Sequence, residues 1–238
     1  MNNSDSANTP EAFLARVFTA QSPPRVTLTF AQSLDGKISS RPGAALQLSG
    51  AESLKMTHVM RTLHSGILVG VGTVLADNPR LTARLAPQPA QHPRPVILDT
   101  HLRTPPDARV FDHPCSPILV AAPGCCVERR RVLEARGAEV VVVDRCDADG
   151  RPRLDAVVED LRARGIDSLM VEGGARVIQA FLRHGELVDA LVITIAPVLV
   201  GPEGVAAVPS MEGIGTMRIE PQLYQQLGAD IVMAADVV

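Results

Sequence analysis

The chain has 238 residues, which is enough for one large α/β domain with a buried core and short for two independent domains. The formal net charge is −3 and only 3% of the residues are aromatic, so neither a basic field nor an aromatic stacking surface favours nucleic-acid binding. No apolar run is long enough to cross a membrane and the N-terminus lacks a secretory signal pattern, which favours a cytoplasmic protein.

Residues 1–24 precede the first strand-like segment, and we expect them to form a polar extension that is partly disordered. Within this extension, residues 11–20 could form a short helix, which the sequence Ser22-Pro23-Pro24 would end. Residues 25–238 are expected to form a single domain.

Short apolar segments rich in β-branched residues recur after residue 25 and predict strands. These segments are 26–30, 66–70, 95–99, 117–121, 140–143, 168–171 and 190–195. The unbroken apolar run at 140–143 is typical of a central parallel strand that is covered on both faces. Two further segments, 217–219 and 231–235, suggest a closing pair of strands near a sheet edge.

Helical patterns lie between the predicted strands and complete a repeated β–α order. They cover 127–136, 154–164 and 175–184, after an earlier helix that ends near Leu63. A capping box over 49–52 is expected to begin that earlier helix. Its core-facing candidates are Leu54, Met60 and Leu63. The order predicts a three-layer α/β fold with a mostly parallel sheet.

Polar or glycine-rich segments follow three of the predicted strands. Because ligands bind at the carboxyl ends of strands in parallel α/β sheets, these segments are candidates for a site. The first segment, 31–38, contains Ser33, Asp35 and Lys37, which offer a hydroxyl, a carboxylate and an ammonium. Taken alone, this segment is better explained as an ordinary Asp-Gly turn.

The second segment, 70–84, begins with two glycines that would let the backbone approach a ligand closely. Amides at the start of the following helix would favour a phosphate. The segment lacks the third glycine of a dinucleotide fingerprint and the lysine of a Walker loop. Together with Asp77, Arg80 and Arg84, it makes an anion or ribose site about as plausible as a plain loop.

The third segment places Glu172 at the end of a strand, and Gly173 and Gly174 then open a helix. The glycine amides could bind a pyrophosphate while Glu172 holds a polar group of a substrate. The alternative is a tight strand-to-helix turn with an exposed glutamate.

Taken in order, these motifs resemble the riboflavin-biosynthesis pyrimidine reductases, which occur alone in fungi and archaea and as the C-terminal half of bacterial deaminase–reductases. The resembling strings are SLDGKIS, SGAESLKMTHVMR, ILVGVGTVLADNPRLTAR, PVILDT, VEGGARVIQAFL and APVLVG, over roughly residues 25–236. The resemblance implies a dihydrofolate-reductase-like fold and a homodimer. It also implies NADPH-dependent reduction of the ribosyl group of a 5-amino-6-ribosylamino-pyrimidine 5′-phosphate to ribityl.

The same resemblance implies roles for individual residues. Cofactor contacts would come from Ala31, Thr73, Asp77, Thr100 and the turn formed by Gly173, Gly174, Ala175, Arg176 and Val177. Substrate contacts would come from Arg61, Leu81, Arg84 and Glu172, with the arginines suited to the 5′-phosphate. Lys37 corresponds to a basic residue close to the substrate, and the loop 122–124 is a candidate for the NADPH 2′-phosphate.

As a mechanistic hypothesis, opening of the ribose ring gives an imine at C1′, to which the nicotinamide delivers hydride. Glu172 and Asp35 are the carboxylates that could stabilise the charge of the imine, and Lys37 could assist proton transfer or hold the phosphate. His58 and His64 lie near Arg61 in the sequence, and a structural role is favoured for both.

Several alternatives stay open at the level of sequence. The standalone form and the AQSLDGKIS and ESLKMTH runs favour the 2,5-diamino substrate over its deaminated counterpart. A reductase of a pterin- or folate-like heterocycle and a non-catalytic nucleotide-binding protein are the competing classes. The chain lacks the zinc-ligand motifs of the deaminase, and its four cysteines show no metal-ligand spacing, so we expect reduced thiols, no bound metal and no deamination.

Overall fold

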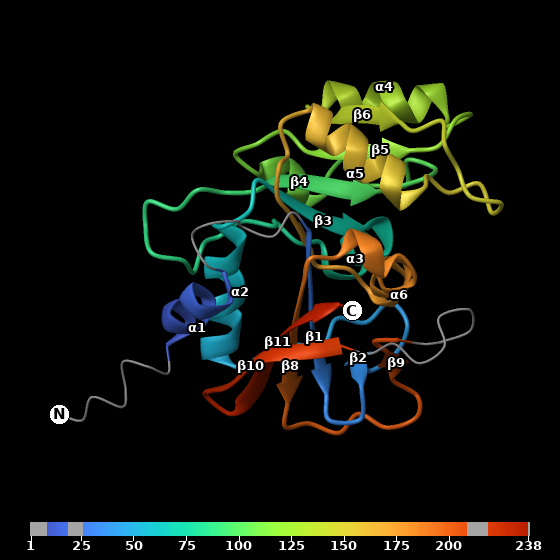
Figure 1. Ribbon diagram of the computed structural model, residues 1–238. Coiled ribbons are helices and arrows are strands. Elements are labelled where there is room, and N and C mark those ends of the chain that lie inside the picture. The colour runs from blue at the N-terminus through green and yellow to red at the C-terminus, as the bar shows by residue number, and fades with distance from the viewer. Residues whose placement is uncertain (1–8, 19–25, 209–218, 238) are drawn as a thin grey trace.

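A computed structural model describes residues 9–18, 26–208 and 219–237, and one nine-stranded sheet runs through them (Figure 1). The strands are β1 (Val26–Ser33), β3 (Gly66–Gly70), β4 (Arg94–Leu98), β5 (Ile118–Ala121), β6 (Glu139–Val142), β7 (Leu169–Val171), β8 (Ala190–Ala196), β10 (Ile219–Leu227) and β11 (Asp230–Val237). Their order is β10-β11-β8-β1-β7-β3-β4-β5-β6. From β8 to β6 all neighbours are parallel, and β11 and β10 extend the β8 edge antiparallel.

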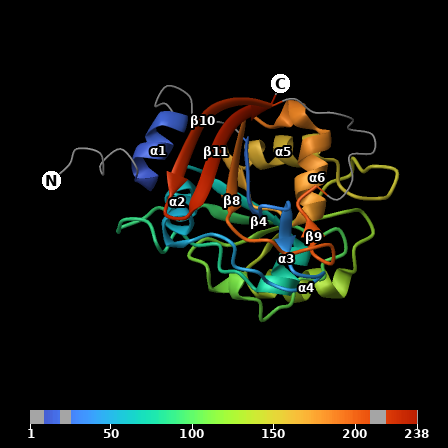
Figure 2. The same ribbon diagram turned by 90° about the horizontal axis from the view of Figure 1, so that it is seen from below.

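Helices form a layer on each face of the sheet, so the predicted three-layer fold with a mostly parallel sheet and an antiparallel C-terminal edge is confirmed. They are α1 (Pro10–Val17), α2 (Ala51–Arg61), α3 (Val71–Asp77), α4 (Val127–Ala135), α5 (Leu154–Ala163) and α6 (Ala175–Arg183). Figure 2 shows α1 and α2 on one side of the strands and α5 and α6 on the other. Two short 3₁₀ turns, η2 (Arg109–Asp112) and η3 (Gly185–Leu187), lie in connections.

The two faces of the sheet carry separate apolar clusters because alternate residues of each strand point to opposite faces. Leu68 and Val171 belong to the cluster under α5 and α6, whereas the neighbouring Met170 packs with α1 and α2. Ile67 faces the same side as Met170, in a third cluster under α3 and α4. The strands that lead to the site are therefore packed on both faces.

The predicted N-terminal helix is present as α1, although residues 1–8 and 19–25 lie outside the described part of the chain. Thr9 caps it by accepting a hydrogen bond from the Ala12 amide at 3.1 Å. Phe13 and Leu14 are buried in the cluster that α1 shares with α2, and Glu11 pairs with Lys55 at 2.7 Å. This helix therefore packs on the domain.

Two predictions about local structure were wrong. Helix α2 begins after Gly50 without a side-chain cap, because the Gly50 amide donates to Asp230 Oδ2 of β11 at 2.7 Å in place of the expected capping box. Met60 is fully buried as predicted, but Leu63 is 42% exposed and Leu54 only partly buried.

Strand β6 is an edge strand, contrary to the prediction that 140–143 forms a central one. Its apolar run has another cause, since Val140 packs in the cluster that contains Leu133 of α4, and Val141 packs in the cluster of α5. Burial on both faces therefore does not require a central position.

The closing pair of strands is confirmed as β10 and β11, and β10 is much longer than predicted; residues 217 and 218 lie outside the described residues. A small second sheet pairs β2 (Lys37–Ser39) with β9 (Val205–Ala206), and neither segment was predicted as a strand. Its pairing contains a register shift between Lys37 and Ser39, and such short segments carry no alternating pattern.

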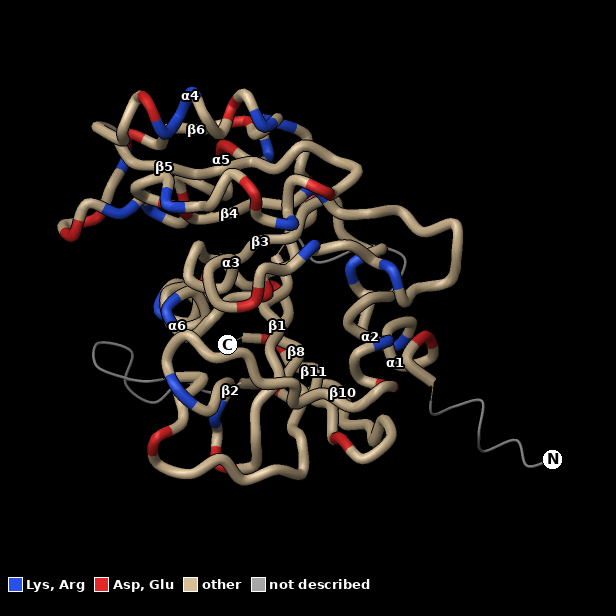
Figure 3. Tube along the Cα trace, turned by 180° about the vertical axis from the view of Figure 1, so that it is seen from behind, with Lys and Arg blue, Asp and Glu red and all other residues tan. Residues whose placement is uncertain are grey.

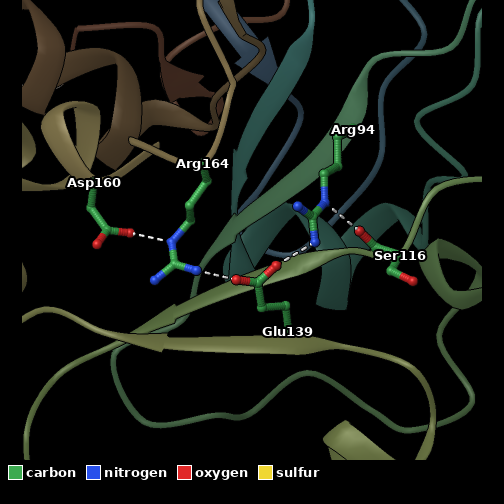
Figure 4. Close-up of polar contacts among 5 residues, drawn as sticks. All are labelled: Arg94, Ser116, Glu139, Asp160 and Arg164. Carbon is green, nitrogen blue, oxygen red and sulfur yellow. Dashed lines mark hydrogen bonds and ion pairs between the residues drawn. The ribbon is translucent and has the colours of Figure 1, made fainter. Parts of the chain in front are cut away.

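Opposite charges are mixed over α4 and α5, as Figure 3 shows, and one network ties the β6 edge to the sheet. Glu139 forms an ion pair with Arg94 at 2.5 Å and a second ion pair with Arg164 (Figure 4). Arg164 also pairs with Asp160 at 2.6 Å. Arg94 also donates to the Ser116 carbonyl at 2.9 Å. Because Arg94 and Glu139 begin their strands, this network lies at the edge opposite to the carboxyl ends.

Candidate functional site

The three segments singled out in the sequence follow strands that are neighbours in the sheet. β1, β7 and β3 are adjacent and parallel, with Val171 in register with both Leu28 and Leu68. The turn after β3 begins at Gly70, and the turn after β7 contains Glu172 and the glycine pair. The topology therefore brings these polar groups to one edge of the sheet.

Two glycine turns are packed against each other at this edge. A Cβ atom on Gly174 would lie 3.2 Å from Thr73 Oγ1, and a Cβ on Gly70 would lie 2.9 Å from Val177. A Cβ on Gly173 would overlap Val177 at 2.4 Å. The start of α6 has Gly174 as its N-cap and no side-chain cap, so its amides are available for an anion.

A buried ion pair joins α2 to the end of β7. Arg61 donates from Nε and Nη2 to the two oxygens of Glu172, each at 2.7 Å. The side chains of Arg61 and Glu172 are 11% and 18% exposed. A third bond runs from Arg61 Nη1 to the Thr82 carbonyl at 2.7 Å. Arg61 is therefore held in one orientation and presents Glu172 as an oriented carboxylate.

The segment that follows α3 carries a second arginine outward. Asn78 and Leu81 have positive φ angles of 42° and 59°, and Leu81 is only 2% exposed. Arg84, in contrast, is exposed, and the described residues place no carboxylate within ion-pair distance of it. Desolvation lowers the pKa of Arg84, followed by the charges of Arg61, Arg109 and Arg80. This group of four arginines is suited to an anionic ligand.

Two histidines of the α2 region are buried close to these arginines. Burial, followed by the charges of Arg61 and Arg84, lowers the pKa of His58 to about 3, so its ring is neutral at physiological pH. His64 lies between Thr27 Oγ1 and the Met60 carbonyl, each at 2.8 Å. Burial also lowers the pKa of His64. Burial thus favours the uncharged form of both rings.

Asp35 is engaged by the loop that follows β8. It accepts hydrogen bonds from Ser33 Oγ at 2.5 Å, the Gly201 amide at 2.7 Å and the Val200 amide at 3.1 Å. These bonds, with that from Ser33 as the largest cause, lower the pKa of Asp35 to about 2. The contacts favour a positioning role for this carboxylate.

Lys37 begins β2 and lies beside Gly204, where an added Cβ would be 2.9 Å from the Lys37 Cγ. No described carboxylate lies within ion-pair distance of its ammonium. No described contact joins Lys37 to the Arg61–Glu172 pair either.

The other residues assigned by resemblance lie at the same edge but are less constrained. Ala31 is on β1, and Thr100 follows β4, with its carbonyl accepting from the Ala122 amide at 3.2 Å. Asp77 ends α3 as an exposed residue, although partial desolvation raises its pKa. Ala175 and Arg176 begin α6, with Arg176 exposed.

One polar contact here was not anticipated from the sequence. The Ala83 amide donates to His92 Nδ1 at 3.1 Å, from the long loop between α3 and β4. Nothing in the local pattern around His92 marks it, because it follows a proline-rich stretch that reads only as loop.

Residues 24–233 match the family model described as the RibD C-terminal domain. The chain belongs to the RibD C-terminal domain family. A 2,5-diamino-6-ribosylamino-4(3H)-pyrimidinone 5′-phosphate reductase of Debaryomyces hansenii is 36% identical over 200 residues, which are 79% of this chain and 80% of that protein. The enzyme of the same name from Methanothermobacter thermautotrophicus is also 36% identical, over 88% of this chain and 96% of its own length.

Solved structures of RibD-family proteins share the fold. The Saccharomyces riboflavin biosynthesis reductase Rib7 superposes with a TM-score of 0.76 at 29% identity, over 96% of this chain and 99% of Rib7. RibD of Acinetobacter baumannii gives a TM-score of 0.78 at 24% identity, over 90% of this chain and 58% of RibD. The fold shared with these structures agrees with the expectation of a dihydrofolate-reductase-like fold for this chain.

No group of three or more His, Cys, Asp and Glu side chains in residues 9–18, 26–208 and 219–237 is arranged to hold a metal ion. Within the same ranges, none of the helices combines the length and the apolar character needed to span a bilayer. The four cysteines carry free thiols.

Proposed function

We propose that this chain is an NADPH-dependent reductase that converts the ribosyl group of a 5-amino-6-ribosylamino-pyrimidine 5′-phosphate to a ribityl group. The 2,5-diamino compound is the favoured substrate, because the D. hansenii and M. thermautotrophicus relatives carry that name. The observation that carries the proposal is the oriented Arg61–Glu172 pair at the strand end that also holds the double-glycine turn. A pterin- or folate-type substrate would lack the 5′-phosphate that Arg84 is proposed to hold, so a requirement for a phosphorylated substrate separates the two classes.

The paired glycine turns fit the phosphates of a dinucleotide. A side chain at Gly174 would meet Thr73 of α3 and one at Gly173 would overlap Val177 of α6, and the start of α6 has no side-chain cap, which leaves its first amides available to a phosphate. Thr73 and Asp77 would contact the ribose and Thr100 the adjoining part of the cofactor, with Ala31, Ala175, Arg176 and Val177 as further contacts. When bound, NADPH supplies the hydride.

The cluster around Arg84 fits the 5′-phosphate of the substrate. Arg61, Arg80 and Arg109 raise the local positive potential, and Arg84 lacks a described carboxylate partner. A phosphate dianion would offset this like-charge repulsion. Arg61 contributes indirectly, since Glu172 and Thr82 occupy three of its nitrogens. Leu81 offers almost no surface, so its proposed contact with the substrate is the least supported.

The chemistry begins with the substrate's own ring. Cleavage of the C1′–O4′ bond, with a proton added to O4′, leaves a positively charged C1′=N group. Addition of hydride to C1′ then gives the ribitylamine. Glu172 would stabilise the developing positive charge, and Lys37, whose ammonium has no described ion pair, would donate the proton or hold the phosphate. Asp35 would act through the loop it holds.

The experiment is NADPH oxidation by the purified protein with the 2,5-diamino substrate and the deaminated substrate side by side. Preference for the diamino compound by at least ~10-fold in kcat/KM supports the proposal, and preference for the other places the enzyme after the deaminase. NADPH binding without turnover of either compound would rule out the pathway assignment. Replacing NADPH with NADH measures the contribution of the 2′-phosphate, for which the 122–124 loop is the proposed contact.

The family resemblance also supports a homodimer located in the cytoplasm. Sedimentation of the purified chain tests the first proposal, since a monomer at micromolar concentration would contradict it. Fractionation of the source cells tests the second.

A further inference from the structure

The backbone segment Leu81–Arg84 carries the arginine that the proposed function assigns to the phosphate. It contains a strained position, because Leu81 has a φ of 59°, a region that side chains other than glycine rarely adopt. Such a conformation persists only where surrounding contacts fix it. The structure shows what those contacts are.

Each residue before Arg84 is fixed by a different contact. The Leu81 side chain is buried in the cluster under α3 and α4, and the Thr82 carbonyl accepts from Arg61 at 2.7 Å. The Ala83 amide donates to His92 Nδ1 at 3.1 Å, and Ala83 is fully buried. An unpaired amide there would be costly, since a buried N–H without a partner loses its bond to water.

The His92 ring is itself oriented by a second histidine. Its centroid lies 5.8 Å from that of His113 in an edge-to-face arrangement. His113 Nδ1 accepts a hydrogen bond from the Cys115 amide at 3.0 Å, which connects the two histidines to the segment just before β5. His92 Nδ1 acts as the acceptor for the Ala83 amide, so this nitrogen is the functional atom of the ring.

We propose that His92 is a positioning residue for the phosphate site: its Nδ1 holds the Ala83 amide and so sets the direction in which Arg84 leaves the backbone. The inference rests on the proposed function for the identity of the phosphate, but the contact itself does not depend on it. His92 touches no ligand in this scheme, and its effect reaches the substrate through Arg84 alone.

The substitution His92→Leu removes the acceptor at similar volume, whereas His92→Asn keeps an acceptor oxygen near the Nδ1 position. Binding of ribose 5-phosphate, measured by calorimetry, is expected to weaken about tenfold in H92L and to stay within about threefold of wild type in H92N. Turnover should show the same pattern as a raised KM with kcat changed less than about twofold. His184→Leu, an exposed histidine at the far end of α6, is the matched control.

A double-mutant cycle with Arg84→Gln separates positioning from general destabilisation. If His92 acts through Arg84, H92L weakens binding of ribose 5-phosphate no further in the R84Q background. Additive losses, or equal losses in H92L and H92N, would overturn the inference, as would wild-type protein that does not bind the probe. Wild-type protein that binds ribose 5-phosphate but reduces no pyrimidine would refute the proposed function and leave the cycle to decide the role of His92.

Discussion

Arg61 and Glu172 form a two-bond ion pair that joins the last residue of α2 to the first residue after β7, 111 positions apart in the chain. The pair is mostly buried, and the third bond of Arg61 continues to the segment that carries Arg84. One guanidinium therefore fixes both the carboxylate proposed to face C1′ and the backbone segment that carries Arg84, the residue proposed to bind the phosphate. A substitution of Arg61 or of Glu172 should therefore change both the chemical step and the binding of the phosphate, but to different extents.

Glu172→Gln is expected to lower kcat by about 100-fold or more, because a neutral amide cannot stabilise a developing positive charge as a carboxylate does. It also leaves the buried Arg61 charge without its counter-ion, so the free energy of unfolding should fall by about 1–3 kcal/mol. Steady-state turnover and urea unfolding measure the two effects. The exposed Glu159→Gln on α5 is the control, and E172Q turnover near wild type would remove Glu172 from the mechanism.

Arg84→Gln is expected to raise KM for the phosphorylated substrate by about 10- to 100-fold while kcat changes little, since a charge-assisted contact to phosphate is lost from both ground and transition states. Stability should not fall, because the change relieves repulsion from Arg61, Arg80 and Arg109. Arg131→Gln on the exposed face of α4 provides the comparison. An unchanged KM would move the phosphate elsewhere.

The positions of the strands along the chain after residue 25 were largely predictable because most strands are short apolar runs buried on both faces. Local rules failed where a distant residue supplied the contact: the start of α2 is satisfied by Asp230, 180 positions away, and not by its own capping box. The prediction that β6 is a central strand was wrong for a different reason: helices α4 and α5 cover both of its faces, so this edge strand is as apolar as a central one.

Some features of the candidate site could also be predicted from the sequence, and others could not. Its strand-end location and glycine turns follow from sequence because topology brings the carboxyl ends of parallel strands together. The roles of individual polar groups do not follow, as Asp35 shows by binding the 200–201 amides and His92 by holding Ala83. These are contacts between loops, and residue type alone does not specify which loop amide a side chain will meet.

Gly173→Ala and Gly72→Ala form a matched pair for the glycine turns. A Cβ on Gly173 would overlap Val177 at 2.4 Å, so G173A should lower the free energy of unfolding by about 1–3 kcal/mol and weaken NADPH binding. A Cβ on Gly72, within α3, meets nothing within 4 Å, and G72A should stabilise by about 0.5–1 kcal/mol. Urea unfolding measures the stability of both variants, and NADPH fluorescence titration measures binding by G173A; a stable, tightly binding G173A would contradict the packing argument.

His58 links protonation to stability near the arginine cluster. Its pKa is about 3 in the folded chain, against an ordinary value of 6.5, because of burial followed by the charges of Arg61 and Arg84. Between these two values the unfolded chain binds a proton that the folded chain does not. The free energy of unfolding therefore rises with pH across this window, by up to about 1.4 kcal/mol per pH unit. The stability that the neutral His58 contributes is complete above pH 6.5 and decreases as the pH falls toward 3.

The substitution His58→Gln removes the side chain that binds a proton in the unfolded chain but not in the folded chain. The slope of unfolding free energy against pH, measured by urea denaturation from pH 6.5 down toward 4, should become shallower by up to about 1.4 kcal/mol per unit. A residual slope is expected from His113, whose pKa burial lowers to about 4. If H58Q changed the stability at every pH by the same amount, the loss would come from packing alone, and His58 would not be the buried neutral group that the structure places beside Arg61.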